Sequence, residues 1–262
     1  MRTRAKKELG QHFLADQNIL GVIGRLAQLD ETDVVLEVGP GRGVLTAYLA
    51  DHVSQVHAIE LDRSLEPALL DELADHPNVD LQFGDALTFD VASLVPAPTK
   101  LVANLPYNVA TPLVAESLDG LPSVGLWCVM VQREVADRFF AEPESKAYGA
   151  VSVLVQLVAQ RTGFHPVSRN VFRPRPNVDS ALVAFRRRGA LPADYPLLKA
   201  VVGAAFAHRR KQLPNSLELA GLASRDQAAA AVSRIGRDPS TRAEALSPEE
   251  FVRLAAALAA LS

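Results

Sequence analysis

Residues 34–50, VVLEVGPGRGVLTAYLA, indicate the fold of this 262-residue chain. A short apolar run at 34–38 is followed at once by three glycines within five residues, and residues 44–50 then carry a helical pattern. This order predicts a strand, a tight glycine turn and a helix. Glycine lets the backbone approach a bound group closely, and the N–H groups at a helix N-terminus attract one. The stretch therefore predicts a ligand at the end of this strand.

Further strands are expected along the chain, separated by helical segments. The run at 124–131 is apolar and unbroken, which is typical of a strand covered on both faces. Strands that alternate with helices favour a parallel sheet with helices packed on it, so we expect an α/β fold. The expected strands are residues 34–38, 56–59, 79–83, 100–103, 124–131 and 180–185, and the expected helices among them are residues 44–50 and 65–74.

The last quarter of the chain has a different character. Arg186-Arg187-Arg188-Gly189 follows the expected strand at 180–185, and two prolines come soon after, which indicates a domain boundary. The residues beyond it are rich in alanine and leucine and lack strand-like alternation. Ser247-Pro248-Glu249-Glu250 has the N-cap serine, first-turn proline and third-position glutamate of a helix start. We expect one domain at residues 1–188 and a small, all-helical second domain at 189–262.

The charge is distributed unevenly along the chain. The net charge is −3, yet residues 30–100 hold 14 acidic against three basic residues, and residues 161–215 hold 11 basic against two acidic residues. Such asymmetry predicts a face that binds a polyanion such as nucleic acid, which the total charge conceals. Scattered, solvated arginines are the alternative explanation.

Several kinds of protein and site are disfavoured. The single cysteine, Cys128, excludes a disulfide framework and a cysteine-based zinc site, and the six histidines show no metal-ligand spacing, so we expect no metal. No apolar run approaches the ~20 residues of a membrane span. The basic start, residues 1–7, leads into Gly10-Gln11-His12 rather than an apolar segment, so we expect no signal peptide. We expect a protein of the reducing cytoplasm.

Four residues near the expected strand ends suit a nucleoside-containing cofactor. Gly39 and Gly41 bring the backbone near the ligand, and Glu60, 21 residues after Gly39, can accept hydrogen bonds from two ribose hydroxyls. Asp85, after the next strand, can accept one from an adenine amine. Proteins that bind a nicotinamide dinucleotide have a similar arrangement of residues. Their G-x-G-x-x-G motif, however, requires glycine at position 44, where this chain has valine. Ordinary turns for the glycines, and a turn or helix cap for Asp85, remain alternatives.

The tetrad at residues 104–107, Asn-Leu-Pro-Tyr, suits methylation of an exocyclic base amine. The lone pair of such an amine is delocalised into the ring, so a site must accept its N–H hydrogen bonds and draw the nitrogen toward tetrahedral geometry. The Asn104 side-chain oxygen and the Leu105 carbonyl can accept them without a strong base. Pro106 brings a fixed φ and no competing N–H, and the Tyr107 ring can stack on an extruded base. A simple strand-end turn is the alternative.

Phe172 is the candidate for the second face of that base, with an ordinary core phenylalanine as the alternative. It lies in Asn170-Val171-Phe172-Arg173-Pro174-Arg175-Pro176, where the prolines stiffen the loop and Arg173 and Arg175 suit phosphates. A second basic cluster, Ala207-His208-Arg209-Arg210-Lys211, suits phosphate contacts at the start of the helical domain.

Together these residues resemble the rRNA adenine N6-dimethyltransferase family of class I S-adenosylmethionine enzymes, and within it the members that act on bacterial small-subunit (16S) rRNA. The resemblance runs nearly end to end. It implies a Rossmann-like, mostly parallel seven-stranded sheet and a helical C-terminal domain that binds rRNA. The motifs that carry it are residues 10–14, 37–41, 59–62, 84–86, 104–108, 145–149, 172–181, 209–211 and 242–247.

The resemblance also implies roles by position. His12 and Leu14 would line the cofactor entrance, and Asn104 would touch both cofactor and target amine. His12 stands where relatives commonly have asparagine, so a main-chain contact carries over at this position. The implied cofactor is S-adenosylmethionine, without a metal. The implied contacts to it are Gly39 with the methionine part, Glu60 with the ribose and Asp85 with the adenine ring.

The implied substrate is a pair of neighbouring adenosines in a hairpin loop near the 3′ end of 16S rRNA, each methylated twice, in the small ribosomal subunit or its precursor. The family also implies a monomer. A 23S rRNA methyltransferase of the macrolide-resistance type is one alternative, although residues 209–211 and 242–244 look more like the small-subunit members. A non-catalytic RNA-binding assembly factor is another, and the intact tetrad argues against it.

Overall fold

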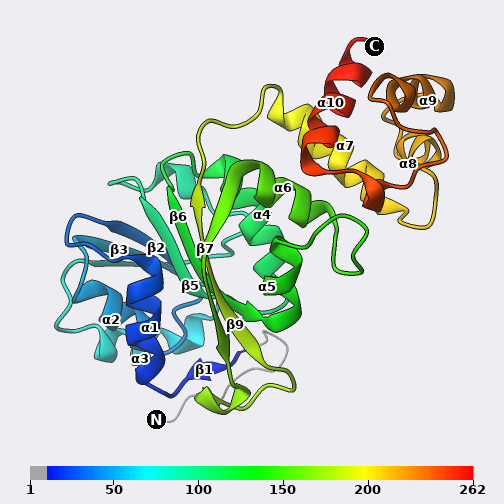
Figure 1. Ribbon diagram of the computed structural model, residues 1–262. Coiled ribbons are helices and arrows are strands. Elements are labelled where there is room, and N and C mark those ends of the chain that lie inside the picture. The colour runs from blue at the N-terminus through cyan, green and yellow to red at the C-terminus, as the bar shows by residue number, and fades with distance from the viewer. Residues whose placement is uncertain (1–10, 262) are drawn as a thin grey trace. The chain divides into compact units, whose positions relative to one another are not determined.

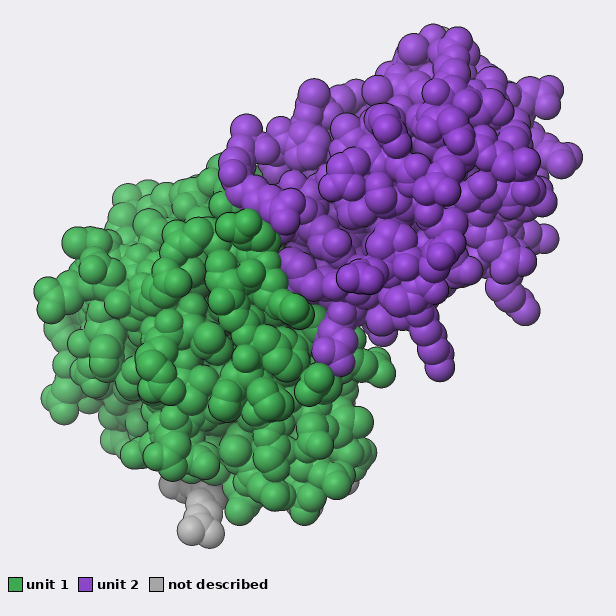
Figure 2. Space-filling view, viewed as in Figure 1, with its two compact units in different colours: residues 1–136, 160–187 green, residues 137–159, 188–262 purple. Residues whose placement is uncertain are grey.

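The computed structural model describes residues 11–261, which form two compact units (Figure 1). The first unit comprises residues 1–136 and 160–187, and the second comprises residues 137–159 and 188–262, as coloured in Figure 2. The basic start of the chain and Gly10 of the first motif lie outside the described residues.

The first unit is built on a seven-stranded sheet in the order β4-β3-β2-β5-β6-β9-β7. Strands β2 to β6 pair in parallel, and β9 pairs antiparallel with β6. The mostly parallel, seven-stranded sheet implied by the resemblance is therefore confirmed. The strands are β1 Phe13–Leu14, β2 Val34–Val38, β3 Gln55–Glu60, β4 Val79–Phe83, β5 Lys100–Asn104, β6 Leu126–Gln132, β7 Ala159–Val167, β8 Phe172–Arg173 and β9 Ser180–Arg187.

The six expected strands form close to their expected bounds, whereas β1, β7 and β8 were not expected. β2 is fully buried along its length, which is why its apolar run is easy to recognise. β7 lies at the end of the sheet, contains Gly163 and Pro166, and exposes its residues 160–162. An edge strand tolerates these residues and needs no apolar alternation, so its sequence carries little strand signal.

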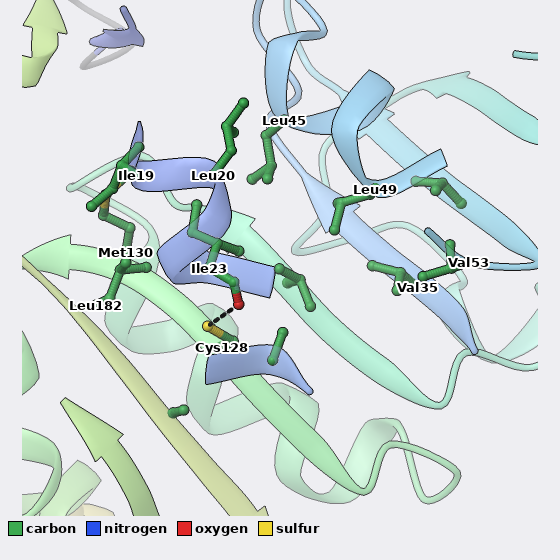
Figure 3. Packing of buried hydrophobic residues seen from close by; sticks show 14 of the residues in the cluster. Ile19, Leu20, Ile23, Val35, Leu45, Leu49, Val53, Cys128, Met130 and Leu182 are labelled. Carbon is green, nitrogen blue, oxygen red and sulfur yellow. Dashed lines mark hydrogen bonds between the residues drawn. The ribbon is translucent and has the colours of Figure 1, made fainter. Parts of the chain in front are cut away.

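Helices cover both faces of this sheet, as alternate residues of β6 show. The Cys128 thiol donates to Ile23 O of α1 (3.9 Å), whereas the Trp127 indole N–H donates to Ser117 Oγ of α4 (2.9 Å). Figure 3 shows the first of these layers, where α1 packs on the strands. Burial raises the pKa of the Cys128 thiol to about 12, so it is inert near neutral pH. The helices are α1 Asn18–Ala27, α2 Val44–Ala50, α3 Glu66–Glu72, α4 Ala110–Gly120 and α5 Arg133–Phe139, with 3₁₀ turns at Arg63–Leu65, Val91–Ser93 and Arg169–Val171.

The described residues of the second unit form mainly helices joined by loops. Its last helix begins as expected, because the Ser247 side chain accepts the Glu250 N–H in a capping box. Residues 137–159, which the sequence analysis placed in the first domain, instead group with these helices. Tyr148 explains why, since its buried ring lies here and its hydroxyl donates to Leu246 O (2.8 Å). The elements are α6 Ala150–Val158, α7 Tyr195–Ala207, α8 Leu213–Leu219, α9 Arg225–Arg234, a 3₁₀ turn at Ala243–Ala245 and α10 Pro248–Ala259.

The helices and the clusters of polar side chains bear on two expectations, the absence of a membrane span and the absence of a metal site. Within residues 11–261, none of the helices is both long and apolar enough to cross a membrane. In the same range, His, Cys, Asp and Glu side chains form no group of three or more suited to a metal ion.

Candidate active site

A pocket of about 1080 Å³, including its opening to solvent, lies in the first unit at the carboxyl ends of the parallel strands. The strand order reverses between β2 and β5, and open α/β sheets bind ligands at such a point. Every proposed site residue except Phe172 lines it. We call one part the cofactor side (Gly39, Gly41, Glu60 and Asp85) and the other the base side (residues 104–107 and His12). His12, which the resemblance placed at the cofactor entrance, is grouped with the base side because it contacts Asn104 and Tyr107.

The glycine turn on the cofactor side has no room for a side chain. Gly39 and Gly41 adopt φ values of +74° and +64°, a conformation that other residues rarely take. A Cβ atom at Gly39 would lie 3.3 Å from Pro106 Cδ, and one at Gly41 would lie 3.0 Å from the Phe13 ring. The turn therefore packs directly against the base side and against β1, and it leaves its backbone at the pocket wall.

Glu60 ends β3 and holds the glycine turn in place. Its Oε2 accepts the Gly41 N–H (3.0 Å) and its Oε1 accepts the Asp62 N–H (2.8 Å). Burial raises the pKa of Glu60, and these two N–H donors partly oppose the rise. Because each carboxylate oxygen has a second lone pair, the side chain can still accept two hydroxyl donors from the pocket.

Asp85 lies just beyond β4 and forms the turn cap that was the alternative to an adenine contact. Its Oδ1 accepts the Leu87 N–H (3.0 Å), which makes it the cap of a tight turn. The same exposed residue lines the pocket. The turn holds one carboxylate oxygen and so fixes the direction of the other.

Residues 11–14, here called the N-terminal strap, connect the two sides of the pocket. The Gln11 side-chain amide donates to Asp62 Oδ2 (2.9 Å), and β1 pairs with β8. The His12 Nδ1 lies 2.8 Å from Pro174 O, so this nitrogen carries the hydrogen, since a carbonyl only accepts. The Asn104 Nδ2 donates to His12 O (3.2 Å). The strap therefore fixes which end of the Asn104 amide is the free acceptor.

The tetrad forms a strand-end turn that also presents hydrogen-bond acceptors. The Leu105 N–H donates to Met130 O (3.0 Å), while its carbonyl oxygen accepts no hydrogen bond from residues 11–261. The Pro106 carbonyl accepts the Val109 N–H (3.1 Å) and leads into α4. The half-buried Tyr107 ring lies 5.4 Å from the His12 ring, centroid to centroid. The two expected acceptors and the expected aromatic ring thus border one pocket.

Phe172 lies elsewhere. It is fully buried, belongs to the apolar cluster beneath α1, and does not line the pocket. The structure thus agrees with the alternative of a core residue. The reason is the pairing of β8 with β1, which places Phe172 opposite Leu14 of the strap and turns its ring into the core. Phe172 therefore supports the strap from behind and offers no face to a base in this structure.

Comparison with known proteins decides the family. The chain matches the family model described as ribosomal RNA adenine dimethylase over residues 2–260. The chain belongs to the ribosomal RNA adenine dimethylase family. Among its relatives is the ribosomal RNA small subunit methyltransferase A of Rubrobacter xylanophilus, 48% identical over 96% of this chain and 94% of the relative. A protein of the same name from Lactiplantibacillus plantarum is 43% identical over 97% of this chain and 90% of the relative.

Solved structures agree with this membership. A dimethyladenosine transferase from Plasmodium falciparum has the same fold, with a TM-score of 0.77 and 22% identity over 93% of this chain and 96% of the other. The 23S rRNA methyltransferase ErmE is similar with a TM-score of 0.66 and 28% identity over 94% of this chain and 99% of the other. The class I methyltransferase fold of the rRNA adenine dimethylases is thereby established for this chain.

The basic residues of this rRNA adenine dimethylase do not all serve as free charges. Arg209 donates to Tyr148 O (2.9 Å) and lies 3.6 Å from Glu244, so it ties the second unit together. Arg173 donates to Asn170 O (3.1 Å) within its own loop. Arg210 and Lys211, beside Arg209, are exposed. Some basic residues therefore stabilise the fold, whereas Arg210 and Lys211 are exposed at the surface.

Glu37 is a charged pocket residue to which the sequence analysis gave no role. It lies in the buried strand β2, is 1% exposed and lines the pocket, and its Oε2 has no hydrogen-bond partner in the described chain. Burial is the main cause that raises its pKa to about 8, and the nearby Glu60 adds to the rise. An acidic residue inside an otherwise apolar strand was the available signal.

Proposed function

We propose that this chain transfers methyl groups from S-adenosylmethionine to N6 of two adjacent adenosines in the 3′-terminal hairpin loop of 16S rRNA, twice on each. The observation that carries the proposal is the hydrogen bond from Asn104 Nδ2 to His12 O. It leaves Asn104 Oδ1 as an acceptor for an amine N–H, in the same pocket as the residues suited to the cofactor.

The cofactor side fits a cationic nucleoside. The glycine turn leaves its backbone exposed at the pocket wall, where side chains are excluded, and Glu37 offers a buried carboxyl oxygen without a partner among the described residues. When bound, S-adenosylmethionine supplies a methyl group carried on a sulfonium cation. Glu60 would accept its ribose hydroxyls, Asp85 its adenine amine, and the Gly39 backbone would contact its methionine part.

The base side suits a purine that has been turned out of its helix. Asn104 Oδ1 and Leu105 O would accept the two N–H bonds of the amine and draw its nitrogen out of conjugation with the ring. Tyr107 would stack on the base. A strongly basic side chain is not needed, because the amine attacks as a neutral group and its proton passes to water after the transfer.

The partner we propose is 16S rRNA within the small ribosomal subunit or its precursor. We propose that this chain binds it as a monomer in the cytoplasm. The relatives named small subunit methyltransferase A support the choice of subunit. The exposed Arg210 and Lys211 and the arginine-rich loop at 169–175 suit phosphates. In this proposal the helical residues 189–262 contribute contacts to rRNA and residues 1–188 the chemistry.

Labelled methyl transfer tests the proposal. Small subunits that lack the modification are incubated with the full chain and methyl-labelled cofactor, and the methylated nucleotides are mapped by mass. We expect two methyl groups on each of two adjacent adenosines in the 3′ hairpin. No label in that hairpin would overturn the proposal.

A 23S rRNA target is the second candidate, and the similarity to ErmE over 94% of this chain favours testing it. Large subunits are therefore assayed in parallel under the same conditions. Erythromycin susceptibility of cells that express the chain gives an independent result. Label in 23S rRNA together with macrolide resistance would assign the chain to the large subunit.

A further inference from the structure

The position of the Tyr107 ring is set by a residue outside the pocket. Its hydroxyl lies 2.7 Å from Ser180 Oγ. Ser180 is 1% exposed, begins β9 and pairs in register with Gln132 of β6. Because a hydroxyl both donates and accepts, either oxygen can be the donor. Ser180 is thus a buried, backbone-fixed anchor for a half-buried aromatic ring at the pocket.

The segment that ends at Ser180 also fixes the second ring of the base side. Pro174 O accepts the His12 Nδ1 hydrogen (2.8 Å), and the His12 and Tyr107 rings are 5.4 Å apart. Asp179, next to Ser180, is held by two hydrogen bonds: its side chain accepts the Arg169 N–H (3.0 Å) and its carbonyl accepts the Arg133 N–H (3.0 Å). Residues 172–180 thereby form a frame around both rings.

The hydrogen bond between Tyr107 and Ser180 uses neither of the oxygens proposed to accept the amine, and it fixes the far end of the Tyr107 ring. Burial raises the pKa of Tyr107, so its hydroxyl stays neutral and keeps its hydrogen near neutral pH. A tyrosine ring turns about two side-chain torsions, and fixing its far end removes that freedom before a base arrives. A ring aligned in advance places the stacked base at a defined distance from Asn104.

We propose that Ser180 is a positioning residue that aligns the Tyr107 ring as the stacking surface for the target adenine. The proposal rests on the function proposed above and adds a residue that the chemistry does not touch. It assigns a purpose to the serine of the motif at residues 172–181. Phe172 of that motif supports the strap, and Ser180 aligns the Tyr107 ring.

The test is a double-mutant cycle with the full chain and unmodified small subunits. Ser180→Ala and Tyr107→Phe each remove the same hydrogen bond, so each should lower the single-turnover methylation rate by about threefold to tenfold. The double variant should lose no more than either single variant, because both changes break one interaction. Ser180→Thr keeps a hydroxyl and should restore most of the rate. Cofactor affinity should stay unchanged in all four variants.

Ser117→Ala is the matched control. Ser117 is also a buried serine that hydrogen-bonds an aromatic side chain, here the Trp127 indole N–H at 2.9 Å, but it does not line or border the pocket. It should lower Tm by an amount similar to Ser180→Ala and leave the methylation rate unchanged. The contrast separates an effect on alignment from a general loss of stability.

The outcomes are distinct. A wild-type rate for Ser180→Ala, or losses that multiply in the double variant, would overturn the positioning role while the proposed function stands. The same holds if Ser117→Ala slows the reaction as much as Ser180→Ala. Absence of transfer by the wild-type chain to small subunits would overturn the proposed function and this role with it.

Discussion

The two sides of the pocket are held together over very different distances along the chain. On the cofactor side, Glu60 binds the N–H of Gly41, 19 residues away, and Asp85 caps a turn at Leu87, two residues away. On the base side, Asn104 donates to His12 across 92 residues, and His12 binds Pro174 across 162. The cofactor side is thus a product of local turns at strand ends, whereas the base side forms only when three distant segments meet.

This difference predicts where a substitution acts. Changes on the cofactor side should alter affinity for the cofactor, because the proposed function places each residue there in contact with it. Changes on the base side should alter the rate of transfer with cofactor affinity preserved, because the contacts there orient the acceptors and the base. The following predictions test that separation, beginning with the largest expected effect.

Asn104→Ala should abolish methyl transfer, with a loss of about 100-fold or more in single-turnover rate, because the amine loses an oriented acceptor. Cofactor affinity, measured by calorimetry, should change by no more than about threefold, which is small on the free-energy scale of binding. Equal losses in both measurements would mean that Asn104 is chiefly a cofactor residue, and the separation of the two sides would not hold.

Gly41→Ala should weaken cofactor binding by roughly tenfold or more, since its φ of +64° strains any side chain and the Cβ would lie 3.0 Å from the Phe13 ring. Gly125→Ala is the control, because no atom lies within 4 Å of a Cβ there. Calorimetric titration of both variants measures the difference. Unchanged affinity in Gly41→Ala would show that the turn can move without cost to the pocket.

Asp85→Ala should reduce cofactor affinity by about tenfold or less, because it removes one hydrogen-bond acceptor at an exposed position. Asp90→Ala, an exposed aspartate outside the pocket lining, is the control. The rate at saturating cofactor should be normal in both. A lower rate at saturation in Asp85→Ala would show that the cofactor side also orients the base.

Glu37 predicts a pH dependence of stability in the cofactor-free protein. Its pKa is raised from 4.5 to about 8 by burial. The unfolded chain releases this proton near pH 4.5 and the folded chain keeps it until about pH 8, so the contribution of Glu37 to stability is lost as pH rises through that window. Tm should fall by several degrees from pH 5 to 8, and Glu37→Gln should flatten the profile. An identical slope in the variant would contradict the assignment.

The same contrast explains what the sequence could predict. The apolar runs of β2 to β6 and the residues that follow them place Glu60, Asp85 and Asn104 at one sheet edge, because carboxyl ends of parallel strands meet there. The bonds of His12 to Asn104 and Pro174 leave no local trace, since neither partner lies near in the chain. The resemblance pointed to His12 and Leu14, but the contacts of the strap and the bond of Ser180 to Tyr107 emerged only from the structure.

Phe172 and residues 137–159 also depend on packing partners that lie far away in the chain and that the local sequence does not predict. An aromatic residue just before two prolines indicates a loop, but the pairing of its strand β8 with β1 decides which way the ring faces. The local sequence gives no sign of that pairing. Likewise, α6 lies in sequence between two strands of the sheet, yet Tyr148 binds Leu246 and the segment packs with the C-terminal helices. Composition predicts that such a helix or strand exists, but it does not predict which elements it packs against.

The pairing of β1 with β8 has a consequence for synthesis of the protein. Residues 13 and 14 leave the translating ribosome early, but their partners at 172 and 173 follow about 160 residues later, which takes roughly 10 to 30 s at ordinary elongation rates. Until then the strap, whose His12 carbonyl orients the Asn104 amide, is not anchored by β8. Because the base side is complete only when β8 has joined β1, we expect methyltransferase activity to appear only after residues 172 and 173 have left the ribosome.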